Sequence, residues 1–180
     1  MTSELDSLIT CMAKAQTGLL SAADAVPADD WQTRPSEEKW SAAELVAHLM
    51  VVERGVIGKA DRVLQHPPKR VSLLKRIHIP MALVESRWIR RKSPVPIEPE
   101  MLRDKEAMLA ELRTVRERSM AFLEETRGRD VREYCWKHPA LGTLNTYEWM
   151  QFIAAHEVRH TKQMREISAS LPKAIESLQK

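Results

Sequence analysis

The chain has 180 residues, a length typical of one folded domain, and 43% of them are hydrophobic, which is enough to form a core. The formal net charge of +3 is too small for a protein whose main task is to coat nucleic acid, so nucleic acid is not an expected partner. The two cysteines, Cys11 and Cys135, form no CxxC pair, which is typical of reduced thiols in a reducing compartment.

The first ten residues carry acidic side chains where a secretory signal needs a basic stretch followed by an apolar run. Nowhere does an uncharged stretch approach the roughly 18 residues that a membrane span requires. We therefore expect a cytoplasmic protein with no membrane partner.

Apolar residues recur every three or four positions from residue 2 to about residue 26, which predicts a first amphipathic helix that ends before Pro27. Ser41 and Glu44 match a capping box, which predicts the start of a second helix that continues to about Gln65. The His-Pro-Pro sequence at 66–68 ends it.

A basic insert follows at residues 69–92, where a solvated excursion with short helices is expected. A third helix is predicted from Pro99 to about Arg127, then a loop at 129–144. Asn145 and Glu148 match a second capping box, from which a fourth helix extends to about Ser170. These elements predict an all-α four-helix bundle in a single domain, residues 1–180, whose long crossover permits helices two and three to run parallel.

Three histidines fall on the faces of these helices that are predicted to be buried. His156 and His160 are four residues apart, so both imidazoles lie on one face of the fourth helix, and His48 shares its face of the second helix with core residues such as Leu45 and Leu49. A single core histidine is usually a packing residue. Three buried imidazoles would leave costly unpaired nitrogens unless something joined them, and a divalent metal ion would do so.

Three imidazole ligands leave an ion with an open coordination position, as in catalytic sites. That position could hold a water, acidified to a pKa of about 7, or a thiolate. HEVRH at 156–160 also matches the HExxH motif of zinc proteases, in which Glu157 would be the general base. We discount that reading because no third ligand follows in the remaining 20 residues, whereas His48 lies upstream on another helix.

A further set of residues occurs in order from the second helix to the fourth: Trp40, Ser41, Glu44, His48, Leu49, Glu53, His138, Pro139, Gly142, His156, Arg159, His160 and Gln163. In this pattern the chain resembles the DinB/YfiT-like superfamily of metal-binding four-helix bundles. The resemblance implies a crossover between helices two and three and one divalent ion, zinc or nickel, bound by His48, His156 and His160. Characterised relatives include metal-dependent hydrolases, S-transferases and isomerases that use low-molecular-weight thiols.

The leading interpretation is therefore a metal-dependent enzyme that acts on a small-molecule substrate, either as a thiol transferase or as a hydrolase. The alternative is a non-catalytic metal-binding or stress-associated protein, which would have a closed coordination shell completed by a fourth protein ligand. The sequence identifies no particular substrate or metal, and it is compatible with a monomer or a homodimer.

Other residues near the predicted site each have two readings. Glu44 either orients an imidazole or only caps its helix, and Glu53 is either a base or ligand or a solvated or ion-paired carboxylate. His138 either approaches the ion or is a turn residue. Arg159 and Gln163 bind substrate or tie helices together. Four tryptophans at the predicted helix starts either pack the rim of the bundle or line a pocket: Trp31, Trp40, Trp136 and Trp149.

Overall fold

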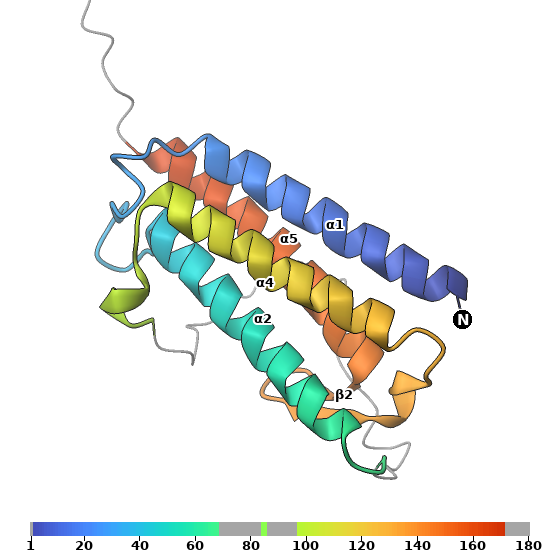
Figure 1. Ribbon diagram of the computed structural model, residues 1–180. Coiled ribbons are helices and arrows are strands. Elements are labelled where there is room, and N and C mark those ends of the chain that lie inside the picture. The colour runs from blue at the N-terminus through green and yellow to red at the C-terminus, as the bar shows by residue number, and fades with distance from the viewer. Residues whose placement is uncertain (1, 69–83, 86–96, 172–180) are drawn as a thin grey trace, which may run out of the picture.

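Four long helices make up most of the computed structural model, which describes residues 2–68, 84–85 and 97–171 (Figure 1). They are α1 (Thr2–Asp24), α2 (Ala42–Leu64), α4 (Lys105–Glu125) and α5 (Thr146–Ser170). Short 3-10 helices lie at Pro99–Met101 and Val131–Glu133, and two short strands, β1 (Cys135–His138) and β2 (Gly142–Asn145), precede α5. The prediction of four long helices is confirmed.

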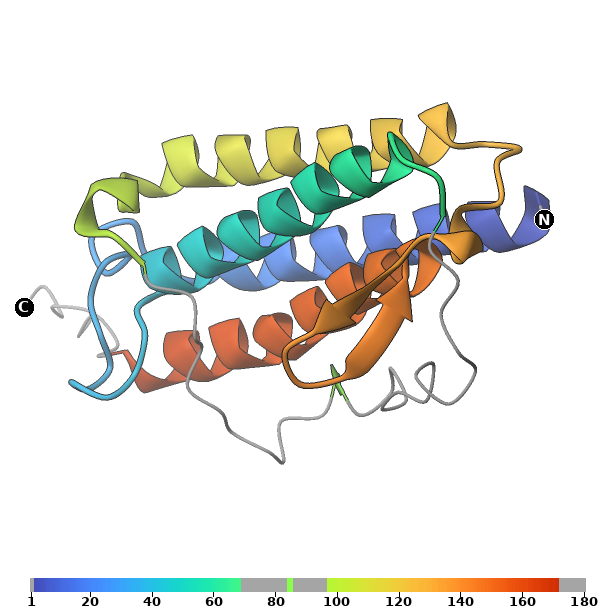
Figure 2. The same ribbon diagram turned by 90° about the horizontal axis from the view of Figure 1, so that it is seen from below.

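Each long helix packs against two others, so that the four enclose a common interior. The contacts join α1 to α5 and α4, and α2 to α4 and α5. In Figures 1 and 2, α1 and α5 run in one direction, whereas α2 and α4 run in the opposite one. The helices on either side of the long connection at 65–104 are thus parallel, as predicted. No helix in the described part of the chain is both long enough and apolar enough to cross a lipid bilayer.

Both predicted capping boxes are present. The Glu44 amide donates to Ser41 Oγ (3.2 Å) and the Ser41 amide to Glu44 Oε2 (2.8 Å). The same reciprocal pair links Asn145 and Glu148 at the start of α5, with distances of 2.9 and 2.8 Å. Since each box satisfies two amides that have no partner inside the helix, these residues fix where α2 and α5 begin.

The predicted start of the third helix at Pro99 was wrong. Pro99 instead begins the 3-10 turn, and α4 starts after Asp104, whose side chain accepts a hydrogen bond from the Ala107 amide (2.8 Å). Asp104 provides the capping oxygen that the first turn of a helix needs, and Pro99 does not.

The all-α prediction also omitted a β-hairpin within the expected loop at 129–144. Strands β1 and β2 are antiparallel, with Cys135 opposite Asn145 and His138 opposite Gly142. Gly142 has a φ of 99°, a conformation that favours glycine. The Trp136 ring stacks on Trp149 of α5 at 5.1 Å, so the hairpin depends on a contact with a helix rather than on a local strand pattern.

The buried apolar residues form two clusters that follow one another along the helices. The first contains Leu19, Leu45, Met50, Leu112, Val115 and Met164 among others, and the second contains Leu8, Val56, Phe122, Met150 and Phe152 among others. Four buried polar side chains lie between the two clusters on α2, α4 and α5, and we call them the polar layer: Glu53, Arg116, Ser119 and Glu157.

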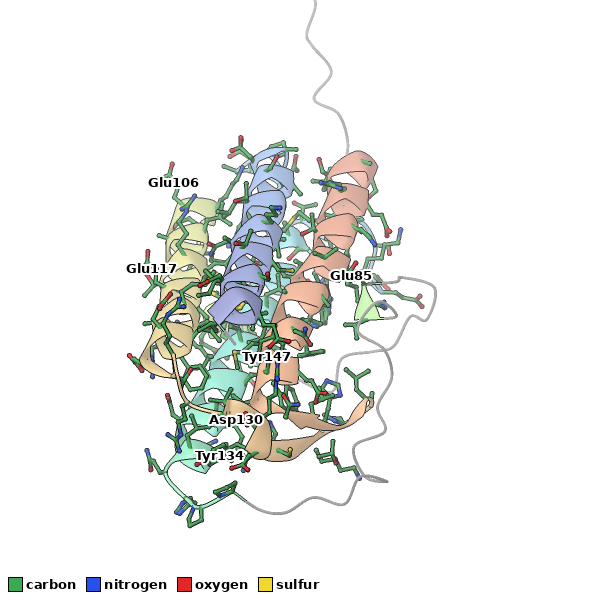
Figure 3. All side chains as sticks on the ribbon, turned by 90° about the vertical axis from the view of Figure 1, so that its right-hand side faces the viewer. Glu85, Glu106, Glu117, Asp130, Tyr134 and Tyr147 are labelled. Atoms are coloured by element: carbon green, nitrogen blue, oxygen red, sulfur yellow. The ribbon has the colours of Figure 1, made fainter. Side chains whose placement is uncertain are left out.

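The predicted insert at 69–92 lies outside the described residues except for Val84 and Glu85. Val84 packs against the second apolar cluster, and the Glu85 carbonyl accepts a hydrogen bond from Lys162 Nζ (2.9 Å). Figure 3 shows Glu85 beside α5. At Val84 and Glu85, the connection between α2 and α4 therefore contacts the rest of the fold, including Lys162 of α5.

Candidate metal centre

Helices α2 and α5 bring together the three histidines that the sequence singled out. His48 of α2 is 4% exposed and His160 of α5 is 7% exposed, while His156 is partly buried. One nitrogen from each ring lies within 4.8 Å of the other two. Among the described residues, this group of three is the one arranged to hold a metal ion.

The separations of the ring nitrogens match those around a shared cation. His156 Nε2 is 3.3 Å from His48 Nε2 and 3.1 Å from His160 Nε2. Two imidazole nitrogens bound to a zinc ion at about 2.05 Å would be about 2.9 Å apart at a 90° angle and about 3.4 Å apart at a tetrahedral angle. Both of these separations fall within this range, and the third pair, His48 and His160, lies within 4.8 Å, so the three donor atoms are near the arrangement that one small divalent ion requires.

Neighbouring side chains hold the three rings in place. His160 Nδ1 is 3.0 Å from the Gln163 side-chain oxygen, an interaction that directs Nε2 of the same ring toward the other imidazoles. Trp40 packs beside His48 at 4.9 Å, and Phe152 stacks on His156 at 5.1 Å. The cluster is therefore enclosed by aromatic rings on two sides.

The surroundings of His48 and His156 keep these two imidazoles neutral. Burial lowers the pKa of His48 from 6.5 to about 4. Burial, together with the neighbouring His160 and His48, holds the pKa of His156 well below its ordinary value, and Arg159 acts in the same direction. Since a metal ion binds the unprotonated nitrogen, this environment suits coordination at neutral pH.

The two glutamates of α2 have structural partners. Glu44 completes the capping box and forms an ion pair with Arg34. Glu53 is 3% exposed and accepts hydrogen bonds from Arg116 (2.8 and 3.0 Å), which makes it an ion-paired carboxylate rather than a solvated one. These contacts explain both residues without a role as ligands.

Arg116 of α4 is a central residue that the sequence analysis did not single out. It is 2% exposed and also donates to Glu157 (2.9 Å) and to the Met12 carbonyl (2.7 Å). One guanidinium therefore joins α1, α2, α4 and α5. A signal was present, since Arg116 shares a helical face with Leu112 and Ser119, at spacings of four and three residues.

Glu157 belongs to this network and not to a protease-like site. It is 1% exposed, and one of its oxygens, Oε1, lacks a hydrogen-bond partner within the described structure. Burial raises the pKa of Glu157 to about 7 despite the ion pair with Arg116. A shallow depression beside it leaves about 0 Å³ for a water-sized molecule and is lined by Leu49, Val52, Glu53, Ile153, His156 and Glu157.

The remaining candidates lie around the cluster. His138 of β1 contacts Phe152 at 4.6 Å, so one aromatic ring separates it from His156. Arg159 is near enough to influence the pKa of His156. Of the tryptophans, Trp31 is 1% exposed and packs in the first apolar cluster, Trp40 contacts His48 of the centre, and Trp149 contacts His138.

Comparisons with known proteins identify the family of the chain. The family model of the DinB superfamily matches residues 12–164, a range that includes all three histidines. The chain is 29% identical over 143 residues to the uncharacterized protein YuaE of Bacillus subtilis (strain 168). The aligned region covers 78% of this chain and 85% of that protein. No solved structure matches the chain. Since the family model covers most of the sequence and contains the whole histidine cluster, the chain belongs to the DinB superfamily.

Proposed function

We propose that the protein is a metal-dependent enzyme that binds one divalent ion, zinc or nickel, through His48, His156 and His160. The observation that supports this most is the pair of nitrogen separations, 3.3 and 3.1 Å, at the spacing of ligands around one cation. Neutral imidazoles bind both ions, so the ligands alone do not select between them.

The arrangement favours an open coordination position over a closed shell. In the part of the chain that is described, the nearby acidic side chains are engaged elsewhere, since Arg116 binds both Glu53 and Glu157. His138 lies beyond Phe152. A small molecule can therefore occupy the remaining position, as in catalytic zinc sites.

The charge of the site suits an anionic nucleophile. Three neutral ligands leave the full positive charge of the ion, and Arg159 adds a cationic group nearby. A divalent ion lowers the pKa of a thiol or a water that binds to it. We place an S-transferase that uses a low-molecular-weight thiol first and a hydrolase second, because a thiolate is soft as well as anionic.

The protein side chains would orient and shield the reacting groups. Gln163 holds the His160 ring, and Trp40 and Phe152 cover the cluster, which limits the access of water. Arg116 binds both buried carboxylates, Glu53 and Glu157, and its single positive charge offsets part of their negative charge, which weakens the repulsion of an anion at the ion.

The test is an assay of protein loaded with zinc or with nickel. Glutathione, bacillithiol and mycothiol are each offered with 1-chloro-2,4-dinitrobenzene, and 4-nitrophenyl acetate is offered without a thiol. We expect metal-dependent turnover that disappears in metal-free protein and in His156→Ala. Tight metal binding without turnover of any of these substrates would contradict the enzyme and favour a non-catalytic metal-binding protein.

A further inference from the structure

His138 connects the hairpin to the face of α5 that carries the metal centre. It is the last residue of β1, and its ring packs against Phe152 (4.6 Å) and Trp149 (5.0 Å), both on α5. Phe152 in turn stacks on His156 at 5.1 Å. Two ring-to-ring steps therefore separate His138 from the cluster, and the hairpin lies along the first half of α5 (Figure 2).

The turn of the hairpin fixes the protonation of the His138 ring. Nδ1 accepts hydrogen bonds from the backbone amides of Ala140 (3.0 Å) and Leu141 (3.1 Å). A nitrogen that accepts two such bonds carries no proton, so the proton of the neutral ring is on Nε2. Burial also lowers the pKa of His138 to about 4, which keeps the ring neutral at pH 7.

The second nitrogen, Nε2, is a hydrogen-bond donor that is not used within the described part of the chain. Both hydrogen bonds of the ring in the described structure involve Nδ1, and no described residue accepts from Nε2. Because Nδ1 faces the turn, Nε2 is on the ring edge away from it. The hairpin thus presents one N–H group of fixed position, two rings away from His156.

We propose that His138 is a substrate-binding residue, whose Nε2–H donates to a carboxylate of the molecule that occupies the open position of the metal centre. This inference rests on the proposed function, because it needs a ligand at that position. The substrate class it specifies is a small thiol that also carries a carboxylate.

Charge and packing both favour this class of ligand. Arg116 offsets part of the negative charge of Glu53 and Glu157, and a divalent ion bound by three neutral imidazoles, with Arg159 nearby, adds positive charge at the site, so an anionic acceptor is preferred to a cation. A hydrogen bond to a charged acceptor is stronger than one between neutral groups. Aromatic side chains lie between the donor and His156, which suits a ligand with an apolar part between thiol and carboxylate.

Two substitutions distinguish the role of Nε2 of His138 from that of Nδ1. In His138→Asn the side-chain oxygen can still accept from the turn amides, as asparagine does in turns, but the donor at the Nε2 position is lost. In His138→Gln the longer side chain can place its NH₂ group near the Nε2 position, but the acceptor for the turn is lost. Both variants lose the aromatic ring, so each is the control for the other.

The experiment measures by calorimetry the binding of 4-mercaptobenzoate and of thiophenol, which lacks the carboxylate, to the zinc-loaded protein. We expect the unaltered protein to bind 4-mercaptobenzoate roughly tenfold to a hundredfold more tightly than thiophenol. His138→Asn should lose this preference and His138→Gln should retain most of it. Equal binding of both probes by the unaltered protein, or the opposite order of the variants, would overturn the proposal.

A second measurement uses only the unaltered protein, so it holds even if the variants fail to fold. Imidazole ¹⁵N spectra of the zinc-loaded protein should show the Nε2–H tautomer of His138, with an Nε2 shift that changes on addition of 4-mercaptobenzoate and not of thiophenol. An unchanged Nε2 signal at saturation would reject the role of His138. If both probes bind equally, the open coordination position is retained and the role of His138 is rejected. If neither probe binds more tightly with zinc than without it, the proposed function is rejected as well.

Discussion

The second nitrogen of each imidazole determines how firmly the ring is held for coordination. For His160 that nitrogen is Nδ1, which lies 3.0 Å from the Gln163 side-chain oxygen, one helical turn further along α5. With the proton on Nδ1 and donated to Gln163, the lone pair of Nε2 is available to a cation. Gln163, which the sequence left between substrate binding and helix packing, is therefore best explained as the residue that orients His160.

The substitution Gln163→Leu should weaken zinc binding roughly tenfold, the lower end of the effect of losing a partner of a ligand. It removes the acceptor for Nδ1 while keeping a side chain of similar size. Competition with a chromophoric chelator measures the affinity. Arg165→Ala, at an exposed position of the same helix, is the control. Equal affinities for the two variants would show that Gln163 does not support the site.

The polar layer determines how α5 is oriented relative to the other helices. Arg116 contacts the Met12 carbonyl of α1, Glu53 of α2 and Glu157 of α5, and Ser119 donates to Glu53 at 2.6 Å. Glu157 directly follows His156 in the chain. Holding the Glu157 side chain against Arg116 thus restricts the rotation of α5 about its axis, which leaves His156 and His160 facing α2.

Replacing Arg116 with methionine should destabilise the fold by about 3 to 5 kcal/mol, because it leaves two buried carboxylates without their partner. Urea unfolding followed by circular dichroism measures the change. Arg113→Ala, an exposed position one turn earlier on α4, should change stability by less than about 0.5 kcal/mol. A loss of less than about 1 kcal/mol in Arg116→Met would contradict the importance of the network.

Local signals predicted those elements that are determined locally. Ser41 with Glu44 and Asn145 with Glu148 specify the starts of α2 and α5 by their own side chains, and both starts were predicted. The hairpin was missed because its strands have four residues each and depend on the stacking of Trp136 on α5. Such a contact between distant segments leaves no periodic pattern in the sequence.

The candidate site could be predicted only in part, for the same reason. Helical spacing places His156 and His160 on one face of α5, and the apolar pattern of α2 places His48 on the buried face of that helix. The separation between His48 and His156, 3.3 Å across 108 positions of the chain, depends on how the helices pack. The burial of Arg116 follows from packing too, and so it appears only in the structure.

At the scale of the whole molecule, the buried imidazoles link stability to pH. The folded-state pKa of His48 is about 4, and its ordinary value is 6.5. Between these pH values the unfolded chain binds a proton that the folded chain does not, so stability falls as the pH falls from 6.5 toward 4. The raised pKa of Glu157 acts in the opposite direction between its ordinary value of 4.5 and about 7.

A comparison with His48→Gln isolates the contribution of that histidine. In metal-free protein, lowering the pH from 7 to 5 should destabilise the unaltered chain by about 2 kcal/mol more than the variant. Urea unfolding of both proteins at the two pH values, with a chelator present, measures the difference. The same pH dependence in both would mean that His48 is not held neutral by burial.

The central claim is that one divalent ion binds where the three imidazoles meet, and the metal content of the purified protein tests it most directly. Elemental analysis of untagged protein loaded with zinc or nickel should give about one ion per chain for the unaltered protein and for His66→Ala, whose histidine is exposed at the end of α2. His156→Ala and His160→Ala should have sharply lower metal content with their helicity retained. An unchanged content in either of these two variants would contradict the assignment of the site.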